Sequence, residues 1–245
     1  LSELGAYSVG KKISKIQSMA FAGPFLGIWT PTMYKIISKD DHKKIFSKIL
    51  PVITFFFCII SLSISILSDE LILVFATKEY LEASNIIFWL CMSQTLFIIN
   101  TILSSGMHIV GKSEYGILVN GIVIILGIIF NILLIPSFGM IGASIGTFLT
   151  FLFQTFVFYI VFQKLYFIPY KINLSISVFI LSFIGYFFIQ QLQFIFSNFF
   201  YILLFKIVSI IIYFFVSIWL FSKNGYSLLY LLKINIDSNN DNSSG

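Results

Sequence analysis

All the basic charge in this sequence comes from lysine, and one lysine, Lys206, lies in an unusual place. The chain of 245 residues contains 15 Lys and no Arg. Lys206 lies about eight residues into a long apolar run, with apolar neighbours on both sides in the stretch LLFKIVSII. An ionisable group inside such a run is a functional hypothesis by default, because a charge within a membrane is costly. The alternative is that its long side chain reaches the nearest polar surface.

Lys12 and Lys15 are further cationic candidates for a functional site, just before and at the start of the first long apolar run. Both fall on the side of the chain that is otherwise poor in lysine, which suggests a specific role. The alternative is again that they extend into a polar surface, as lysines near helix ends usually do. Gln17 neighbours Lys15 on the same segment.

The other polar side chains inside the apolar runs are amides and one histidine. They are Gln94, Asn100, His108, Asn120, Asn131 and Gln154. We expect most of them to form hydrogen bonds between helices. His108 could titrate near neutral pH.

Groups that could carry catalysis are missing from the expected places. Four carboxylates lie within 69–83, but their spacing gives no paired acid and base, and no His or Arg accompanies them. Cys58 and Cys91 lie inside apolar runs and are interpreted as packing residues. We therefore expect no enzyme, no catalytic residue, no metal and no cofactor. The net charge of +5 is scattered over the hinges, which argues against a nucleic-acid partner.

The elements that position these residues are about seven apolar segments, each long enough to cross a bilayer as a helix. They lie near 16–37, 47–68, 86–109, 117–136, 140–163, 172–190 and 199–221. The composition is 58% hydrophobic and 10% charged, with mean hydropathy +1.00, and continuous runs argue against a membrane barrel. The sequence predicts an all-α integral membrane protein whose partners include membrane lipids.

The lysines also predict the orientation of the chain. With the first residues outside, ten lysines fall on the inner side, whereas only Lys11, Lys12, Lys15 and Lys78 fall on the outer side. The inner set is Lys35, Lys39, Lys43, Lys44, Lys48, Lys112, Lys164, Lys171, Lys223 and Lys233. Because cytoplasmic loops carry the excess of lysine, the C-terminus is expected in the cytoplasm.

The connections between segments differ in kind. We expect 38–47 to form a short interfacial helix, because its Phe and Ile could lie down into the membrane. Residues 69–83 form a longer outer connection, and the polar tail from about Asn235 should be disordered. The chain begins at Leu1 without Met or a signal pattern, and we interpret it as a fragment.

Glycine and proline mark two special places. Gly23, Pro24, Gly27 and Pro31 predict a kink in the first segment. In the stretch 131–147, Pro136 stops one helix, Gly139 permits a reversal, and the small residues that follow allow close packing. They are Gly142, Ala143 and Gly146.

The string NILLIPSFGMIGASIGT (131–147) resembles the signature hairpin of polysaccharide exporters and O-antigen flippases, in the superfamily shared with multidrug exporters. Three shorter stretches look like further family elements. They are Leu4–Val9 followed by Lys12 and Ile13, Tyr80–Ala83, and Gly111–Ser113, with Pro31, Tyr34 and Lys35 fitting the inner end of the same first helix. The resemblance covers roughly residues 4–165.

This resemblance implies the second half of a fourteen-helix protein built from two lobes. Residues 1–165 would be a partial C-lobe (helices 8–12), 166–223 a trailing helix pair, and 224–245 a cytoplasmic, largely disordered tail. A missing N-terminal half of the same polypeptide would complete the cavity between the lobes, so that Lys206 could also pair with a carboxylate there.

The resemblance further implies a function: moving an oligosaccharide linked to a polyprenyl pyrophosphate across a bacterial or archaeal cytoplasmic membrane. The residues that would then bind substrate are Lys12, Lys15, Gln17, Lys35 and Lys206. The lysines would be compact point charges for the phosphates, and Gln17, beside Lys15, is the best candidate among the amides for lining the cavity. Two alternatives stay open. A multidrug or cation antiporter would more naturally hold an acidic residue inside a span, and a polysaccharide polymerase or glycosyltransferase would need catalytic groups in an outer loop.

Overall fold

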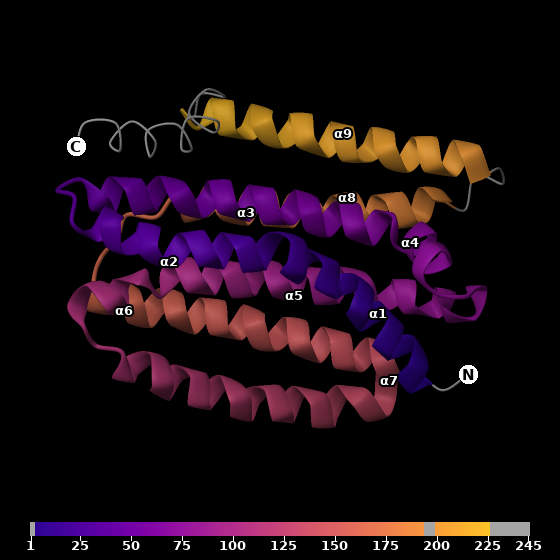
Figure 1. The fold of residues 1–245 in the computed structure, drawn as a ribbon, viewed down its shortest axis with the longest axis horizontal. Helices are drawn as coiled ribbons and strands as arrows, with labels where there is room; N and C mark the ends of the chain where they lie inside the picture. Colours follow the sequence, from indigo (N-terminus) through magenta and orange to yellow (C-terminus); the bar gives the residue numbers. More distant parts are fainter. Residues whose placement is uncertain (1–2, 194–198, 226–245) are drawn as a thin grey trace.

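The computed structural model describes residues 3–193 and 199–225, and this part of the chain is almost entirely helical (Figure 1). The elements are α1 (Glu3–Gln17), the π-helical turn η1 (Ser18–Ala22), α2 (Gly23–Ile37), α3 (His42–Ile66), α4 (Ser68–Phe75), the 3-10 segment η2 (Lys78–Ala83), α5 (Ser84–Leu103), α6 (Ser105–Val110), α7 (Glu114–Leu165), α8 (Ile172–Gln193) and α9 (Phe199–Lys223). The prediction of an all-α membrane protein is confirmed.

Five helical stretches are long and apolar enough to cross a membrane. They are His42–Ile66, Lys78–Val110, Glu114–Leu165, Ile172–Gln191 and Phe200–Lys223. The stretch Glu114–Leu165 has 52 residues, and the chain reverses direction at Gly139 inside it, so it supplies two of the predicted segments. The first predicted segment is shared among α1, η1 and α2, and neither α-helix reaches 18 residues. These elements together account for the seven predicted segments.

The tight hairpin predicted within 131–147 is confirmed. Gly139 has φ 53° and ψ −130°, a left-handed conformation that reverses the chain between the two legs of α7. Gly142 lies directly against the backbone carbonyl of Leu134, where a Cβ atom would not fit. Gly146 packs beside the amide of Asn131, so small residues bring the two legs together as expected.

The first segment is kinked, and the break lies just before the prolines. In η1, the N–H of Gly23 donates to the carbonyl of Ser18, five residues back. Pro24 has no N–H to donate, and its ring would clash with the Ala20 carbonyl in a regular α-helix. A wider turn ahead of Pro24 relieves that clash, whereas Pro31 stays within α2.

The predicted short interfacial helix over 38–47 is wrong. Only 38–41 form a link, because residues from His42 onward are the first turns of α3 and continue to Ile66. The longer connection predicted at 69–83 contains α4 and η2.

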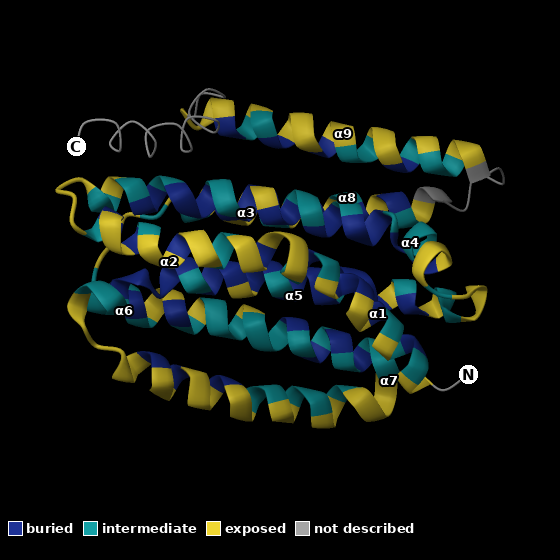
Figure 2. Cartoon of the chain, viewed as in Figure 1, coloured by how far each residue is buried: buried dark blue, intermediate teal, exposed yellow. Residues whose placement is uncertain are grey.

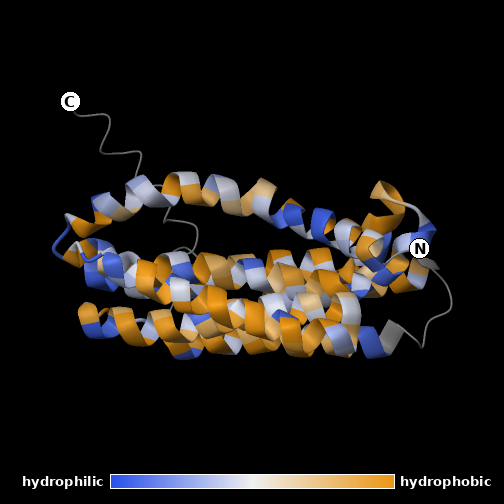
Figure 3. Ribbon diagram, turned by 90° about the horizontal axis from the view of Figure 1, so that it is seen from below, coloured by the Kyte–Doolittle hydropathy of each residue, from blue (hydrophilic) through white to orange (hydrophobic). Residues whose placement is uncertain are grey.

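The interior of the described helices is centred on α5. Its Phe88 stacks on Tyr186 of α8 with ring centroids 3.9 Å apart, and Phe183 meets the same ring edge-on at 4.9 Å. Figure 2 shows α5 largely buried, while the first leg of α7 and much of α9 are exposed. Figure 3 shows apolar residues along the ribbons of the bundle, with a more polar stretch near the N-terminus. The exposed apolar helices are the surfaces that lipid would cover.

The connections alternate between the two ends of the bundle (Figure 1). The links 38–41, 111–113 and 166–171 and the end of α9 lie at one end, which we name the lysine-rich end. Its lysines are Lys35, Lys39, Lys43, Lys44, Lys48, Lys112, Lys164, Lys171 and Lys223. Leu1, Lys233 and the predicted disordered tail from about Asn235 lie outside the described residues, and the boundaries 1–165, 166–223 and 224–245 stay predictions.

Candidate functional site

One face of α1 carries lysines and stays exposed. Lys12 and Lys15 are three residues apart, which places them on the same side of a helix, and Lys11 lies beside them. All three are exposed, whereas Gly10 and Ile13 on the other side pack inward. Gly10 permits that packing, because a Cβ atom there would meet Ile86 of α5 at 2.7 Å. We name the exposed side of α1 and α2, which carries Lys11, Lys12, Lys15 and Lys35, the lysine face.

Gln17 does not belong to the lysine face, so the prediction that it lines a cavity with Lys15 needs correction. It is 0% exposed and lies between α3 and α5. Its amide N–H donates to the Thr95 hydroxyl at 3.1 Å, and its carbonyl accepts from the Ser61 hydroxyl at 3.1 Å. Ser61 and Thr95 also bond to each other at 2.7 Å.

The buried triad of Gln17, Ser61 and Thr95 helps to hold the lysine face in place. Gln17 is the last residue of α1, and the π-helical turn begins at the next residue. The triad therefore fixes the end of α1 to two other helices at the point where the segment bends. A firmly held α1 presents Lys12 and Lys15 in a defined position.

Lys35 is exposed, but it lies far from Lys12 and Lys15. Twenty residues separate it from Lys15, which corresponds to about 30 Å along a helix. The buried side of α2 carries Trp29, Met33 and Ile36. The lysine face therefore has cations near both of its ends and an exposed stretch between them that includes Gly27 and Pro31.

Lys206 is held by carboxylates of this same chain. It is 1% exposed, and its Nζ lies 2.8 Å and 2.9 Å from the two carboxylate oxygens of Glu70 and 3.7 Å from Asp69. Glu70 and Asp69 are in the first turn of α4. The expected options for Lys206 were a phosphate, a polar surface or a carboxylate of another half, and the structure provides a partner inside the chain instead.

Most of the other embedded amides bind one another, as expected. Asn100 of α5 donates to Gln154 at 3.0 Å, and Gln154 donates to Asn120 at 2.8 Å across the two legs of α7. Asn131 donates to the Gly127 carbonyl of its own helix. The bonds of Asn100, Gln154 and Asn120 join packed helices as expected, whereas that of Asn131 stays within its own helix.

Comparison with curated proteins finds a distant relative. The chain is 26% identical over 162 residues to a probable low-salt glycan biosynthesis flippase, Agl15, of Haloferax volcanii. The match covers 63% of this chain and 33% of the relative, so the chain spans about a third of that protein's length. No protein-family model matches the chain, and no solved structure matches it. The relative supports a flippase-type family, and its name mentions no O antigen.

Proposed function

We propose that this chain is part of a flippase that moves an oligosaccharide, linked to a polyprenyl pyrophosphate, across the cytoplasmic membrane for a cell-surface polysaccharide such as O antigen. Two findings support the proposal: the similarity to a glycan biosynthesis flippase and the lysine face. The lysine face is the observation that carries it. Charged side chains facing hydrocarbon are costly, so a water-filled cavity or a second lobe opposite would suit an exposed face bearing lysines.

The geometry of the lysine face fits a two-sided cycle. Lys12 and Lys15 lie toward one end of α1–α2, and Lys35 lies toward the lysine-rich end. In our proposal Lys35 binds the diphosphate on the cytoplasmic side, and Lys12 and Lys15 bind it on the outer side. The N-terminal half of the polypeptide would form the opposite wall, and rocking of the two lobes would open the cavity to each side in turn.

The test is transport by the intact protein carrying Lys12→Gln and Lys15→Gln together. We expect transport of lipid-linked oligosaccharide into proteoliposomes to fall about tenfold or more, since a hydrogen bond to a charged group contributes about 1.5–3 kcal/mol. Abundance in the membrane should not change, because both side chains are exposed.

The matched control is Lys78→Gln, which removes an exposed lysine from η2 at the same end of the bundle. Its transport should equal that of the unmodified protein. Equal transport by the double variant and by this control would remove Lys12 and Lys15 from the proposed binding site.

A further inference from the structure

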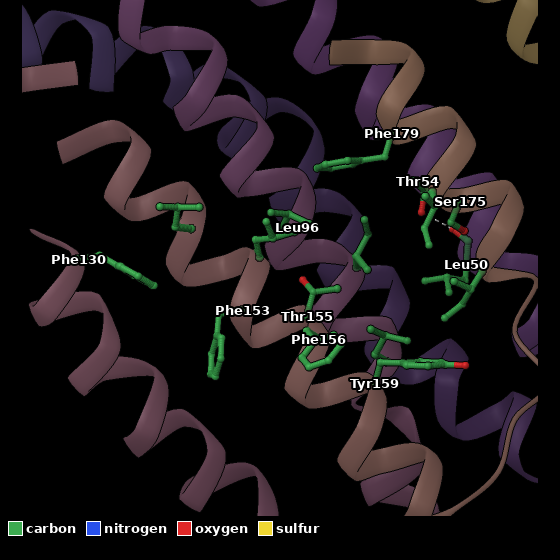
Figure 4. Close-up of a pocket in the computed structure, with 16 residues that line it drawn as sticks. Leu50, Thr54, Leu96, Phe130, Phe153, Thr155, Phe156, Tyr159, Ser175 and Phe179 are labelled. Carbon is green, nitrogen blue, oxygen red and sulfur yellow. Dashed lines mark hydrogen bonds between the residues drawn. The ribbon is translucent and has the colours of Figure 1, made fainter. Parts of the chain in front are cut away.

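A cavity of about 730 Å³ lies between α3, α5, both legs of α7, and α8 (Figure 4). Its volume is in the range of about 300–1,000 Å³ that is typical of ligand sites. Phe130 comes from the first leg of α7, Phe153 and Phe156 come from the second leg, and Phe179 comes from α8. The residues lining it come from these four helices, so the cavity is separate from the lysine face on α1 and α2.

The lining of the cavity is apolar. The Thr54 hydroxyl donates to the Leu50 carbonyl and the Thr155 hydroxyl donates to the Phe151 carbonyl, so both are satisfied within their own helices. Ser175 also lines the cavity, and its Oγ is buried without a hydrogen-bond partner in the protein. A site with so few polar groups holds water poorly and suits a hydrocarbon chain.

The cavity opens on an outer surface of the bundle. Phe156 is 62% exposed and Ile176 is 50% exposed, and they lie on the facing helices α7 and α8. Exposed apolar residues such as Ile160 and Ile180 continue this surface on both helices. In a membrane, the mouth of the cavity therefore faces lipid chains.

Positive charge lies close to one end of the cavity. Ile172 lines it and directly follows Lys171, whose ammonium donates to the Asn224 carbonyl at 3.2 Å. Tyr159 lines it and precedes Lys164 by five residues, about 7.5 Å along the helix. Both lysines belong to the lysine-rich end. A chain lying in the cavity would thus place an attached headgroup among cations.

We propose that this cavity binds a membrane phospholipid with an anionic headgroup: the hydrocarbon chain fills the space between α7 and α8, and the phosphate lies at Lys164 and Lys171. The lipid is a resident component of the fold. It is distinct from the transported substrate, because no residue of α1 or α2, which carry the lysine face, lines the cavity, and its binding requires no transport.

The experiment measures lipid retained by the intact protein in nanodiscs of phosphatidylcholine and phosphatidylglycerol in equal amounts, by native mass spectrometry. Leu152→Trp fills the cavity from α7, and Ile176→Trp fills it from α8. We expect the unmodified protein to retain phosphatidylglycerol preferentially and both variants to lose it. Lys164→Gln with Lys171→Gln should weaken the preference by about fivefold for each lysine, the size of one lysine's attraction to an anionic surface.

Ile160→Trp is the matched control, because Ile160 is 38% exposed on the same leg of α7 as Leu152, which is 40% exposed, but does not line the cavity. It should retain phosphatidylglycerol. The proposal is overturned if both filling variants retain as much of this lipid as the control, or if the unmodified protein retains the two lipids equally. Displacement by an equal amount of a polyprenyl phosphate would also overturn it, by assigning the cavity to the substrate's tail.

Discussion

The contact between Lys206 and Glu70 is an ion pair with unequal partners. The lysine is 1% exposed, whereas the carboxylates of α4 are partly exposed. Removing a carboxylate therefore leaves a buried charge without its main partner, while removing the lysine leaves carboxylates that water can reach. Losing one partner of a buried pair costs far more than replacing the whole pair.

We predict that Glu70→Ala lowers the free energy of unfolding by about 3 kcal/mol, the lower end of the usual range because Asp69 remains nearby. Lys206→Met combined with Glu70→Gln should recover most of this loss. Thermal unfolding in detergent measures both. Glu79→Ala, an exposed carboxylate of η2, is the control and should change stability by less than about 0.5 kcal/mol. Equal effects of Glu70→Ala and Glu79→Ala would contradict the pairing.

The Gln17 triad leads to a second prediction, in which stability and transport separate the two interpretations of this residue. Gln17→Ala leaves the buried hydroxyls of Ser61 and Thr95 without their amide partner, so the free energy of unfolding should fall by about 1–3 kcal/mol. Ser8→Ala is the control, since that exposed hydroxyl bonds only to its own helix. Lost transport with unchanged stability would instead return Gln17 to the substrate site.

The sequence indicated which residues belong to the candidate site better than it indicated where their side chains point. The sequence shows that Lys12, Lys15 and Lys35 lie at the ends of the first segment, and these lysines are indeed exposed. It could not show the partner of Lys206, because Glu70 is 136 residues away along the chain. The one indication of this pairing in the sequence was that Lys206 and Glu70 lie at similar distances from the same end of the bundle. Nor could it show that Gln17 points inward, since that depends on how α1 packs on α3 and α5.

Among the elements, the α7 hairpin depends on a contact between backbones. A Cβ atom on Gly142 would collide with the Leu134 carbonyl, and backbone cannot yield as a side chain can. We predict that Gly142→Ala lowers the free energy of unfolding by about 1–3 kcal/mol through overpacking. Gly121→Ala, on the first leg of α7, has open space around the new methyl group.

The Gly121 control should leave stability unchanged or raise it slightly, because alanine favours a helix over glycine. The measurement is the free energy of unfolding of the two variants in detergent. If Gly142→Ala is as stable as Gly121→Ala, the two legs are not held together by this close approach.

Helices were predicted well where length and glycine or proline determine them. Apolar runs specify spans, and Gly139 specifies the hairpin, because few other residues adopt its φ of 53°. The break in the first segment lies ahead of Pro24, since a proline disturbs the turn before it. The start of α3 at His42 was missed, because a mixture of charged and apolar residues fits both an interfacial helix and the first turns of a span.

At the scale of the whole molecule, the described helices have two unlike surfaces. The lysine face on α1 and α2 would meet water or a second lobe, while α9 and the first leg of α7 expose large apolar side chains suited to lipid. The links alternate between two ends, and nine lysines gather at one of them. By the preference of cytoplasmic loops for lysine, we expect that end to face the cytoplasm.

This orientation can be measured with a thiol reagent that does not cross membranes. The native Cys58 and Cys91 are both 0% exposed, so these two cysteines should remain unlabelled. We predict that Lys78→Cys, in the connection at the opposite end, reacts in intact cells, while Ser38→Cys, in the first link of the lysine-rich end, reacts only after the membrane is opened. Detergent-solubilised protein, in which both sites should react, controls for accessibility. The reverse pattern would place the lysine-rich end outside and reverse the proposed order in which Lys35, Lys12 and Lys15 meet the substrate.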